Sequence, residues 1–265
     1  MSGFYIGVDG KARKVKGGYI GIDGKARKIK KGYIGDENGA ARLCFVDSPY
    51  DPVFANNTWA EIAEACHTNN VPDAWAVGDQ KTMSIGGTNY TIDIIGRNHD
   101  DYSDGSGKAP LTFQLHDCYN TKYVMDSDGE NTRGWTDCAI RVTHIPTILA
   151  KMPTEVKGAI REVVKMTSVG NADTTIESAN DKLFLLSEIE IFGTTRFSAN
   201  GEGGQYEYYA SGGNTIKRFN GSAATYIERS PRKDLYNRYC AVSTSGVAST
   251  CEPQYENAIS PAFCF

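Results

Sequence analysis

The chain has 265 residues, of which 40% are hydrophobic and 23% charged, the composition of an ordinary globular protein. This length allows one large domain with its own core, or one domain and an appendage. No stretch of about 18 apolar residues occurs, which excludes a membrane-spanning helix, and no secretory signal is expected because the N-terminus lacks an apolar segment.

The net charge of −4 is distributed unevenly along the chain. Residues 1–32 hold nine Lys and Arg against two Asp, a charge of +7, so the remaining residues carry −11. A basic segment can bind nucleic acid, but these cations follow the period of a repeat and lack a stacking platform. We therefore expect a solvated face and no nucleic-acid partner.

Seven cysteines are present, an odd number, without a CxxC pair or a Cys/His spacing typical of zinc sites. Cys66 and Cys138 fall among residues expected to be helical, and Cys264 ends an apolar run. We expect most of them to be buried thiols, consistent with synthesis in a reducing cytosol.

The first 43 residues contain an internal repeat with a period of 14 residues, seen in the spacing of Tyr5, Tyr19 and Tyr33. Each unit places an Asp-Gly or Asn-Gly pair between two short β segments, which predicts a β-hairpin. A lone hairpin is marginally stable, so the units are expected to stack on each other, on partner chains or on a larger assembly. We interpret residues 1–44 as an attachment or oligomerisation segment.

Residues 45–70 are expected to form a linker and a helix. Thr58 and Glu61 have the spacing of a capping box, which predicts a helix from Trp59 to about His67. Residues 75–79 and 81–96 are predicted strands, with a hairpin turn between Ser84 and Tyr90.

Helical spacing then occurs at residues 111–120 and 135–152, and residues 153–165 predict an amphipathic helix. Residues 183–192 predict a strong strand, and residues 205–209 a short helix. His144, close to an apolar stripe, is interpreted as a core histidine.

The polar loop 98–107 resembles a calcium loop superficially. Tyr102 stands where the second oxygen ligand should be, and no glutamate closes the loop. Asp126 to Gly129 is a weaker version of the same pattern. We expect capped turns at both places, and no metal site.

Residues 228–265 combine a plain frame with chemically mixed inserts. Arg229 to Pro231, Cys240 to Val242 and Ile259 to Phe265 form the frame. The first insert (residues 232–239) and the second insert (residues 247–257) hold charges, Tyr, Cys and Pro without a helical or strand period. Rigid aromatic rings and Arg are typical of binding surfaces, although ordinary surface loops are the alternative. The candidate ligand-binding residues are Arg232, Lys233, Asp234, Tyr236, Asn237, Arg238, Val247, Ser249, Cys251, Glu252, Gln254, Tyr255, Glu256 and Asn257.

No nucleophile-elbow, P-loop, zinc-protease or dinucleotide-binding motif is present. Residues 201–204 are glycine-rich but lack the preceding strand and following helix of a phosphate loop. We expect no catalytic residue and no cofactor. A Cys–His nucleophile stays an alternative only because both residue types occur.

The chain resembles a family of domains from bacteria and their prophages in three stretches, residues 94–107, 183–193 and 228–265. That family is similar to the C-type-lectin-like fold shared by formylglycine-generating-type domains and the variable proteins of diversity-generating retroelements. The resemblance covers roughly residues 70–265 and implies an α+β fold, with residues 71–265 as a C-type-lectin-like ligand-binding domain. The N-terminal repeat resembles repeats on phage structural proteins.

The resemblance implies a hypervariable, non-enzymatic receptor-binding protein on a phage tail or virion, made in the bacterial cytoplasm. The implied partners are a host-surface protein or glycan and, through the repeats, virion or tail proteins; a homotrimer follows only by analogy with tail tips. The calcium-and-sugar motifs of C-type lectins are absent. One alternative is a structural virion protein with a non-binding lectin-like domain. The other is a formylglycine-generating-type enzyme. That activity needs a pair of cysteines in its groove, and the spacing of Cys240, Cys251 and Cys264 does not match such a pair.

Overall fold

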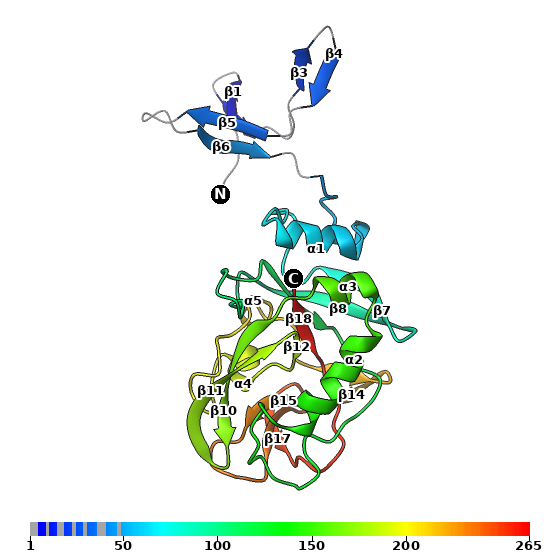
Figure 1. Cartoon of the computed structure of the whole chain (residues 1–265), viewed down its shortest axis with the longest axis vertical. Coiled ribbons are helices and arrows are strands. Elements are labelled where there is room, and N and C mark those ends of the chain that lie inside the picture. Colours follow the sequence, from blue (N-terminus) through cyan, green and yellow to red (C-terminus); the bar gives the residue numbers. More distant parts are fainter. Residues whose placement is uncertain are drawn as a thin grey trace. The chain divides into compact units, whose positions relative to one another are not determined.

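The computed structural model describes residues 49–265 completely and, between residues 5 and 46, the backbone of six strands. The chain divides into two units, Met1–Asp51 and Pro52–Phe265, the second of which we call the body. The six strands form three antiparallel pairs, β1 (Tyr5–Val8) with β2 (Lys11–Lys14), β3 (Tyr19–Ile22) with β4 (Lys25–Lys28), and β5 (Lys31–Gly35) with β6 (Ala41–Val46) (Figure 1).

These pairs are the hairpins predicted from the repeat. Of the basic side chains in this unit, only that of Lys25 is described, and it is exposed. The other cations expected to form a solvated face lie outside the described residues.

The body begins with η1 (Phe54–Asn56) and α1 (Trp59–His67), and the predicted capping box of α1 is confirmed. The Thr58 hydroxyl accepts the Glu61 N–H at 3.2 Å, and the Glu61 carboxylate accepts the Thr58 N–H at 2.7 Å. Trp59 faces inward, with its ring 5.8 Å from that of Phe113 and 6.2 Å from that of Phe265. The helix is therefore anchored to the aromatic core of the body.

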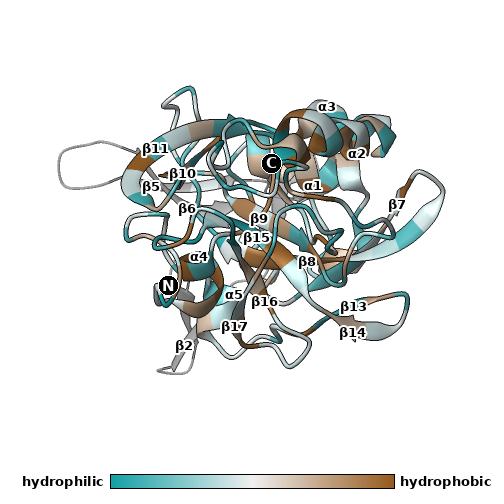
Figure 2. Ribbon diagram, turned by 90° about the horizontal axis from the view of Figure 1, so that it is seen from below, coloured by the Kyte–Doolittle hydropathy of each residue, from teal (hydrophilic) through white to brown (hydrophobic). Residues whose placement is uncertain are grey.

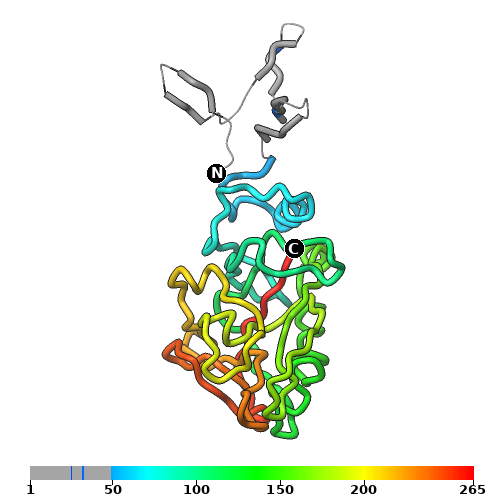
Figure 3. The backbone as a smooth tube through the Cα atoms, turned by 90° about the vertical axis from the view of Figure 1, so that its left-hand side faces the viewer, coloured from blue at the N-terminus to red at the C-terminus, as the bar shows by residue number. Residues whose placement is uncertain are grey.

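An antiparallel five-stranded sheet crosses the body in the order β12-β18-β9-β8-β7. Its strands are β12 (Leu183–Phe184), β18 (Ala262–Cys264), β9 (Leu111–Leu115), β8 (Thr88–Arg97) and β7 (Gln80–Ile85). Phe263 of β18 pairs with Phe113 of β9, and their rings stack at 5.2 Å. The C-terminal strand is thus inserted in the sheet interior, where it appears red in Figure 3.

A second, three-stranded sheet consists of β15 (Tyr226–Pro231), β16 (Tyr239–Val242) and β17 (Ala248–Cys251). Figures 1 and 3 show α1 at one end of the body and β15 and β17 toward the other. Two hairpins complete the strands, β10 (Val163–Gly170) with β11 (Asp173–Asp181) and β13 (Lys217–Phe219) with β14 (Ser222–Ala224). Brown, hydrophobic segments in Figure 2 lie in the middle of the body, around β9 and β15.

The remaining helices are short: η2 (Ile140–His144), α2 (Ile145–Lys151), α3 (Thr154–Ala159), α4 (Glu188–Phe192) and α5 (Glu207–Ala210). The predicted α+β class is therefore confirmed, as is the short helix near residues 205–209. Among the described residues, no helix has the length and apolar character needed to span a membrane.

Several predicted elements were wrong. Residues 75–79 form turns, because the Asp79 carboxylate accepts the Ala76 N–H at 2.9 Å and Gly78 has a φ of 94°. Residues 111–115 form a strand although their spacing looked helical. All five are buried, so the sequence carries no strand alternation.

Residues 183–192 do not form one long strand. The strand ends at Phe184, and α4 begins after Ser187, whose hydroxyl accepts the N–H of Glu190 at 3.3 Å. Glu190 returns a hydrogen bond to the Ser187 N–H, a capping box that the apolar run concealed. Gly193, with a φ of 69°, ends the helix.

The helices predicted for residues 135–152 and 153–165 were also longer than the helices observed. The helical part of 135–152 begins only at Ile140, and Val142 within it is exposed. The helix predicted for 153–165 ends at Ala159, and β10 begins at Val163.

Candidate functional site

The two inserts meet at one end of the β16–β17 ladder. The first insert joins β15 to β16, and Tyr239 pairs with Cys251 across the ladder. This register brings Arg238 and Glu252 together, and their side chains form an ion pair. The orange and red-orange segments of Figure 3 show this region, at the end of the body away from α1.

The second insert is more regular than predicted. Residues 248–251 form β17, so Ser249 and Cys251 are partly buried strand residues. Val247 lies at the opposite end of the ladder from Glu252, because Val242 pairs with Ala248 there. The separation of the two ends is about 10 Å at the usual rise per strand residue. The structure therefore does not bring Val247 together with the other candidate residues.

Most charged groups of the inserts have partners within the chain. Arg232 pairs with Asp234 at 2.5 Å, and the Lys233 ammonium donates to the Thr195 carbonyl at 2.9 Å. The Gln254 side chain donates to Glu252 at 2.7 Å. These cations and polar groups are engaged by partners within the chain, so they stabilise the conformation of the inserts and are less available to a charged ligand.

Other candidate residues serve the loop backbone or face solvent. Asn257 donates its amide to the Tyr255 carbonyl at 2.9 Å. Asn237 is partly buried, whereas Glu256 is exposed.

Exposed apolar and aromatic side chains are concentrated in the inserts. Tyr236 is 53% exposed, Tyr255 63% and Leu235 38%. Together with Val247 they make up four of the six large hydrophobic side chains that are exposed in the described part of the chain. Three of the four lie at the Arg238–Glu252 end of the ladder. We call Leu235, Tyr236 and Tyr255 the apolar rim.

Asn131 positions the backbone of the first insert and was not anticipated from the sequence. Its side-chain amide donates to the carbonyls of Leu235 at 2.8 Å and Arg238 at 2.7 Å. Its side-chain oxygen accepts the Asn171 N–H at 2.7 Å. The sequence carries no signature of this role, since the partners of Asn131 lie 40, 104 and 107 residues away along the chain.

The segment before Asn131 supports the second insert in the same way. The Met125 N–H donates to the Pro253 carbonyl at 2.9 Å, and Tyr123 and Asn257 form an isolated β-bridge. Residues 123–131 thus contact both inserts, and these contacts fix the backbone that carries the side chains of the apolar rim.

The frame residue Arg229 is completely buried. Its guanidinium donates to Glu190 at 3.0 Å, to the Leu185 carbonyl at 3.0 Å and to the Glu202 carbonyl at 2.8 Å. Burial would lower the pKa of Arg229, but the Glu190 carboxylate outweighs it and the pKa is raised. Arg229 thereby connects the start of the first insert to α4, as expected for a residue that holds the shape.

The group nearest to a metal site among the described residues is His99, Asp100 and Glu190, whose ligand atoms lie within 4.8 Å of one another. The Lys165 ammonium lies between the two carboxylates, 2.7 Å from Asp100 and 2.6 Å from Glu190. Burial would raise the pKa of Asp100, but Lys165 outweighs it and the pKa is lowered. A cation thus already neutralises this group, and these residues do not fit a metal ion.

The loop 98–107 likewise has its acidic groups engaged. Asp101 pairs with Lys108 at 3.0 Å, and Asp104 pairs with Arg161 at 2.5 Å. The Asp104 carboxylate also accepts the Ser106 N–H at 2.9 Å, the capped turn that we predicted.

The six cysteines of the described residues are free, and five of them are buried. Burial raises the pKa to about 12 for Cys66, Cys118, Cys138 and Cys251. Burial also raises the pKa of Cys240 and Cys264 well above its ordinary value. A thiol in this state is a poor nucleophile at neutral pH. His144, which we expected in the core, is only partly buried and stacks on Tyr123 at 4.5 Å.

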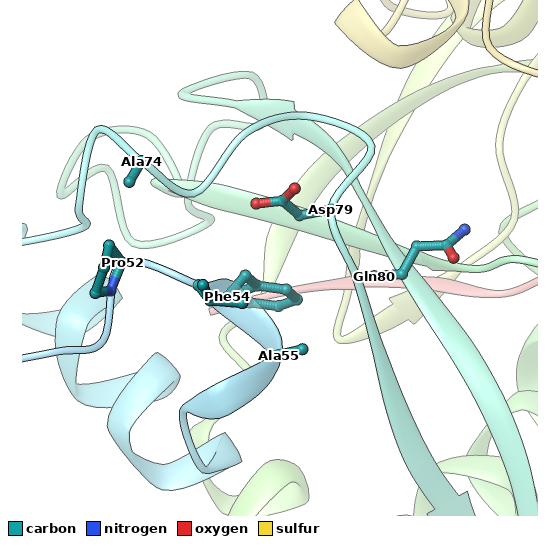
Figure 4. Close-up of a pocket in the computed structure, with 7 residues that line it drawn as sticks. Pro52, Phe54, Ala55, Ala74, Asp79 and Gln80 are labelled. Atoms are coloured by element: carbon teal, nitrogen blue, oxygen red, sulfur yellow. The ribbon is translucent and has the colours of Figure 1, made fainter.

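One pocket of about 300 Å³ lies at the start of the body, between η1 and the beginning of β7 (Figure 4). Phe54 and Ala55 line one side, and Asp79 and Gln80 the other. The polar groups are occupied, since Asp79 accepts the Ala76 N–H and the Gln80 amide lies 2.9 Å from Asp93. This pocket is a weaker candidate than the insert surface.

Residues 112–265 match a family model described as Domain of unknown function (DUF6273). The match begins in β9 and contains Asn131, Arg229 and both inserts. Neither a curated protein nor a solved structure matched the chain.

Proposed function

This chain belongs to the DUF6273 family, and we propose that it is a binding protein that grips its partner with the two inserts at the end of the β16–β17 ladder. The apolar rim supplies the contact area, and the ion pair of Arg238 with Glu252 joins the two inserts. The function requires no metal and no chemical step in the chain itself. A rigid scaffold that carries exposed aromatic loops is a common design for recognition.

The observation that carries this proposal is the combination of exposed aromatics with a fixed backbone. Tyr236 and Tyr255 are each more than half exposed, yet the backbone of their loops is held by hydrogen bonds from residues 123–131. A loop that is ordered before binding loses little conformational entropy when the partner arrives. Exposed apolar and aromatic side chains that gather in two neighbouring loops are typical of an interaction site.

We further propose that the body is C-type-lectin-like and that the inserts are diversified, as in the variable proteins of diversity-generating retroelements. The division between a buried frame at Arg229 and solvent-facing insert side chains supports this proposal, because such a frame tolerates substitution around it. In this proposal the chain acts on a phage tail or virion, and its partner is a host-surface protein or glycan. The N-terminal hairpins attach it to the virion.

The formylglycine-generating alternative is supported less well. That chemistry needs a reactive thiol, and burial raises the pKa of all six thiols of the described residues. In the structural-virion alternative, Tyr236 and Tyr255 would pack against neighbouring virion proteins, so that alternative predicts no enrichment of variants on bacterial cells.

A display library tests the proposal and needs no purified partner. Positions 235, 236, 255 and 256 are randomised together on the full chain, and the variants are sorted first for folding and then on intact bacterial cells from a strain panel. We expect most variants to fold and a subset to be enriched on particular strains.

The matched control library randomises exposed residues of the β10–β11 hairpin, Asp173, Thr174 and Thr175. It should fold equally well and give no enrichment. The proposal fails if the insert library mostly unfolds, because the inserts would then be structural, or if both libraries are enriched alike.

A further inference from the structure

A second polar pocket, of about 340 Å³, lies beside the C-terminal end of α1, and we call it the α1 pocket. The side chains that matter are His67, Asn69, Asn98, Ser106, Lys108 and Arg161. None of the residues that line it, all within the body, is acidic. This is unusual in a chain with a net charge of −4, where acids outnumber bases outside the N-terminal repeat. The carboxylates nearest to it, Asp101 and Asp104, pair with Lys108 and Arg161 but lie outside the lining. A donor-rich lining of this kind favours an anionic ligand.

Arg161 is held in a fixed orientation with spare donors. Its guanidinium lies over the Tyr102 ring at 3.7 Å. The hydrogen bonds that hold the guanidinium, to Asp104 and to Ser106 at 2.8 Å, both use Nη2. Nε and Nη1 therefore keep donors for a ligand, but they point to different sides of the guanidinium, so an oxyanion oxygen accepts a single hydrogen bond from one of them.

Lys108 provides the second cation. Its ammonium donates to the His99 carbonyl at 3.1 Å and pairs with Asp101 at 3.0 Å. The Lys108 side chain is 48% exposed and that of Asp101 66%. Exposed ion pairs of this kind are weak, so a dianion between Lys108 and Arg161 can displace Asp101 and Asp104 into solvent.

The pocket is larger than an inorganic anion requires, and its remaining surface suits hydroxyl groups. Asn69 and Asn98 both have positive φ, 51° and 50°, and their backbone N–H groups are bonded within the chain. Neither side-chain amide makes a hydrogen bond within the described residues. Each amide therefore offers a donor and an acceptor to a ligand.

We propose that the α1 pocket binds a small organic phosphate, with the phosphate between Lys108 and Arg161 and ligand hydroxyls on Asn69 and Asn98. This inference is independent of the proposed function, because α1 and the inserts lie at opposite ends of the body (Figure 1).

Isothermal titration of the full chain with glycerol 3-phosphate tests the assignment. We expect saturable binding with a dissociation constant on the order of 0.1–1 mM. Inorganic phosphate should bind about tenfold more weakly, and glycerol should give no heat. Lys108→Gln should weaken glycerol 3-phosphate binding about tenfold, because it removes one charged donor.

Lys108 is the residue to substitute because its side chain is half exposed, so the change should leave the fold intact. Arg161 also packs on Tyr102, so its substitution would disturb the packing as well. Lys122→Gln is the matched control: Lys122 is likewise exposed and lies 5.0 Å from the Phe219 ring, outside the pocket. Its binding should equal that of the unsubstituted protein. The proposal is overturned by an absence of binding, by equal affinity for inorganic phosphate, or by a Lys108→Gln variant that binds as well as Lys122→Gln.

Discussion

Arg229 and Glu190 form an ion pair in the interior of the body, with Nη2 3.0 Å from Oε1. Lys165 and Asp100 complete the group, so two cations neutralise two carboxylates without solvent. We expect Arg229→Leu to lower the free energy of unfolding by about 3–5 kcal/mol, because it leaves the Glu190 carboxylate with too little positive charge. Urea denaturation at neutral pH measures this loss.

Arg232→Leu is the matched control, since Arg232 lies three residues away and pairs with the exposed Asp234. Its effect should stay below about 1 kcal/mol. Equal losses for the two variants would contradict the structural role given to Arg229.

Asn131→Ala should release the first insert. The substitution removes three hydrogen bonds: the Leu235 carbonyl and the Asn171 N–H lose their partner, whereas the Arg238 carbonyl keeps the Arg232 N–H at 3.0 Å. We expect a loss of about 2–3 kcal/mol and faster amide exchange in residues 232–238. Hydrogen–deuterium exchange followed by mass spectrometry locates the effect.

Asn257→Ala serves as its comparison, because that amide makes one local bond to the Tyr255 carbonyl. It should cost less than about 1 kcal/mol. If the first insert exchanges no faster in Asn131→Ala than in Asn257→Ala, then Asn131 does not position it.

The sequence predicted local features well where their signal is short-range. The hairpins follow from Asp-Gly pairs flanked by β segments, and α1 follows from Thr58 and Glu61 at capping distance. The capping box of Ser187 and Glu190 has the same spacing, but a run of apolar residues on both sides made a strand look more favourable. In β9 both faces are buried, so its sequence lacks the alternation of apolar and polar residues by which a strand is usually recognised.

The candidate site could be predicted only in part. Arginine and tyrosine at positions 232–239 and 252–257 indicated a surface, and the register of β16 and β17 brings these residues together. Asn131 and Glu190 could not be found, because their roles depend on partners far away in the sequence. Nor could the sequence reveal that Lys165 would occupy the space between two carboxylates.

Tyr236→Ala and Tyr255→Ala should separate stability from binding. Both side chains are more than half exposed, so each substitution should change the free energy of unfolding by less than about 0.5 kcal/mol. Tyr239→Ala should cost about 3–5 kcal/mol, because Tyr239 is fully buried and donates to the Gly134 carbonyl at 2.7 Å. Thermal unfolding gives the comparison, and adhesion to the cells that the display library identifies gives the binding. Adhesion that survives loss of both exposed rings would contradict the proposed function.

Lys217 should make stability rise with pH above neutrality. Its side chain is buried and donates to the carbonyls of Leu115 at 2.6 Å and His116 at 2.9 Å. Burial lowers the pKa of Lys217 from 10.5 to about 8. Between these values the unfolded chain binds the proton and the folded chain does not, so this group adds stability as the pH rises, by up to about 3 kcal/mol.

Lys217→Met isolates this contribution from those of the buried tyrosines and cysteines, whose raised pKa values act in the opposite direction. Urea denaturation of both proteins from about pH 7 to 10 should show the stability of the unsubstituted protein, relative to Lys217→Met, increasing with pH. A difference independent of pH would show that Lys217 titrates alike in both states.

Glu228 should destabilise the body at neutral pH. Both carboxylate oxygens are buried without a hydrogen-bond partner, and burial, together with Glu188 and Glu202, raises the pKa of Glu228 well above 4.5. As the pH rises past about 4.5, the Glu228 carboxyl therefore loses its proton in the unfolded chain and keeps it in the folded protein, so the free energy of unfolding falls. Glu228→Gln imitates the protonated form, so it should be the more stable protein at about pH 7 and lose this advantage near pH 4.

Urea denaturation at both pH values measures the effect, with Glu256→Gln as the control at an exposed position. The control should differ from the unsubstituted protein by less than about 0.5 kcal/mol at either pH. The opposite result would be a Glu228→Gln variant whose stability, relative to the unsubstituted protein, is lower at neutral pH than at acid pH. It would mean that the carboxyl of Glu228 ionises more readily in the folded protein than in the unfolded chain.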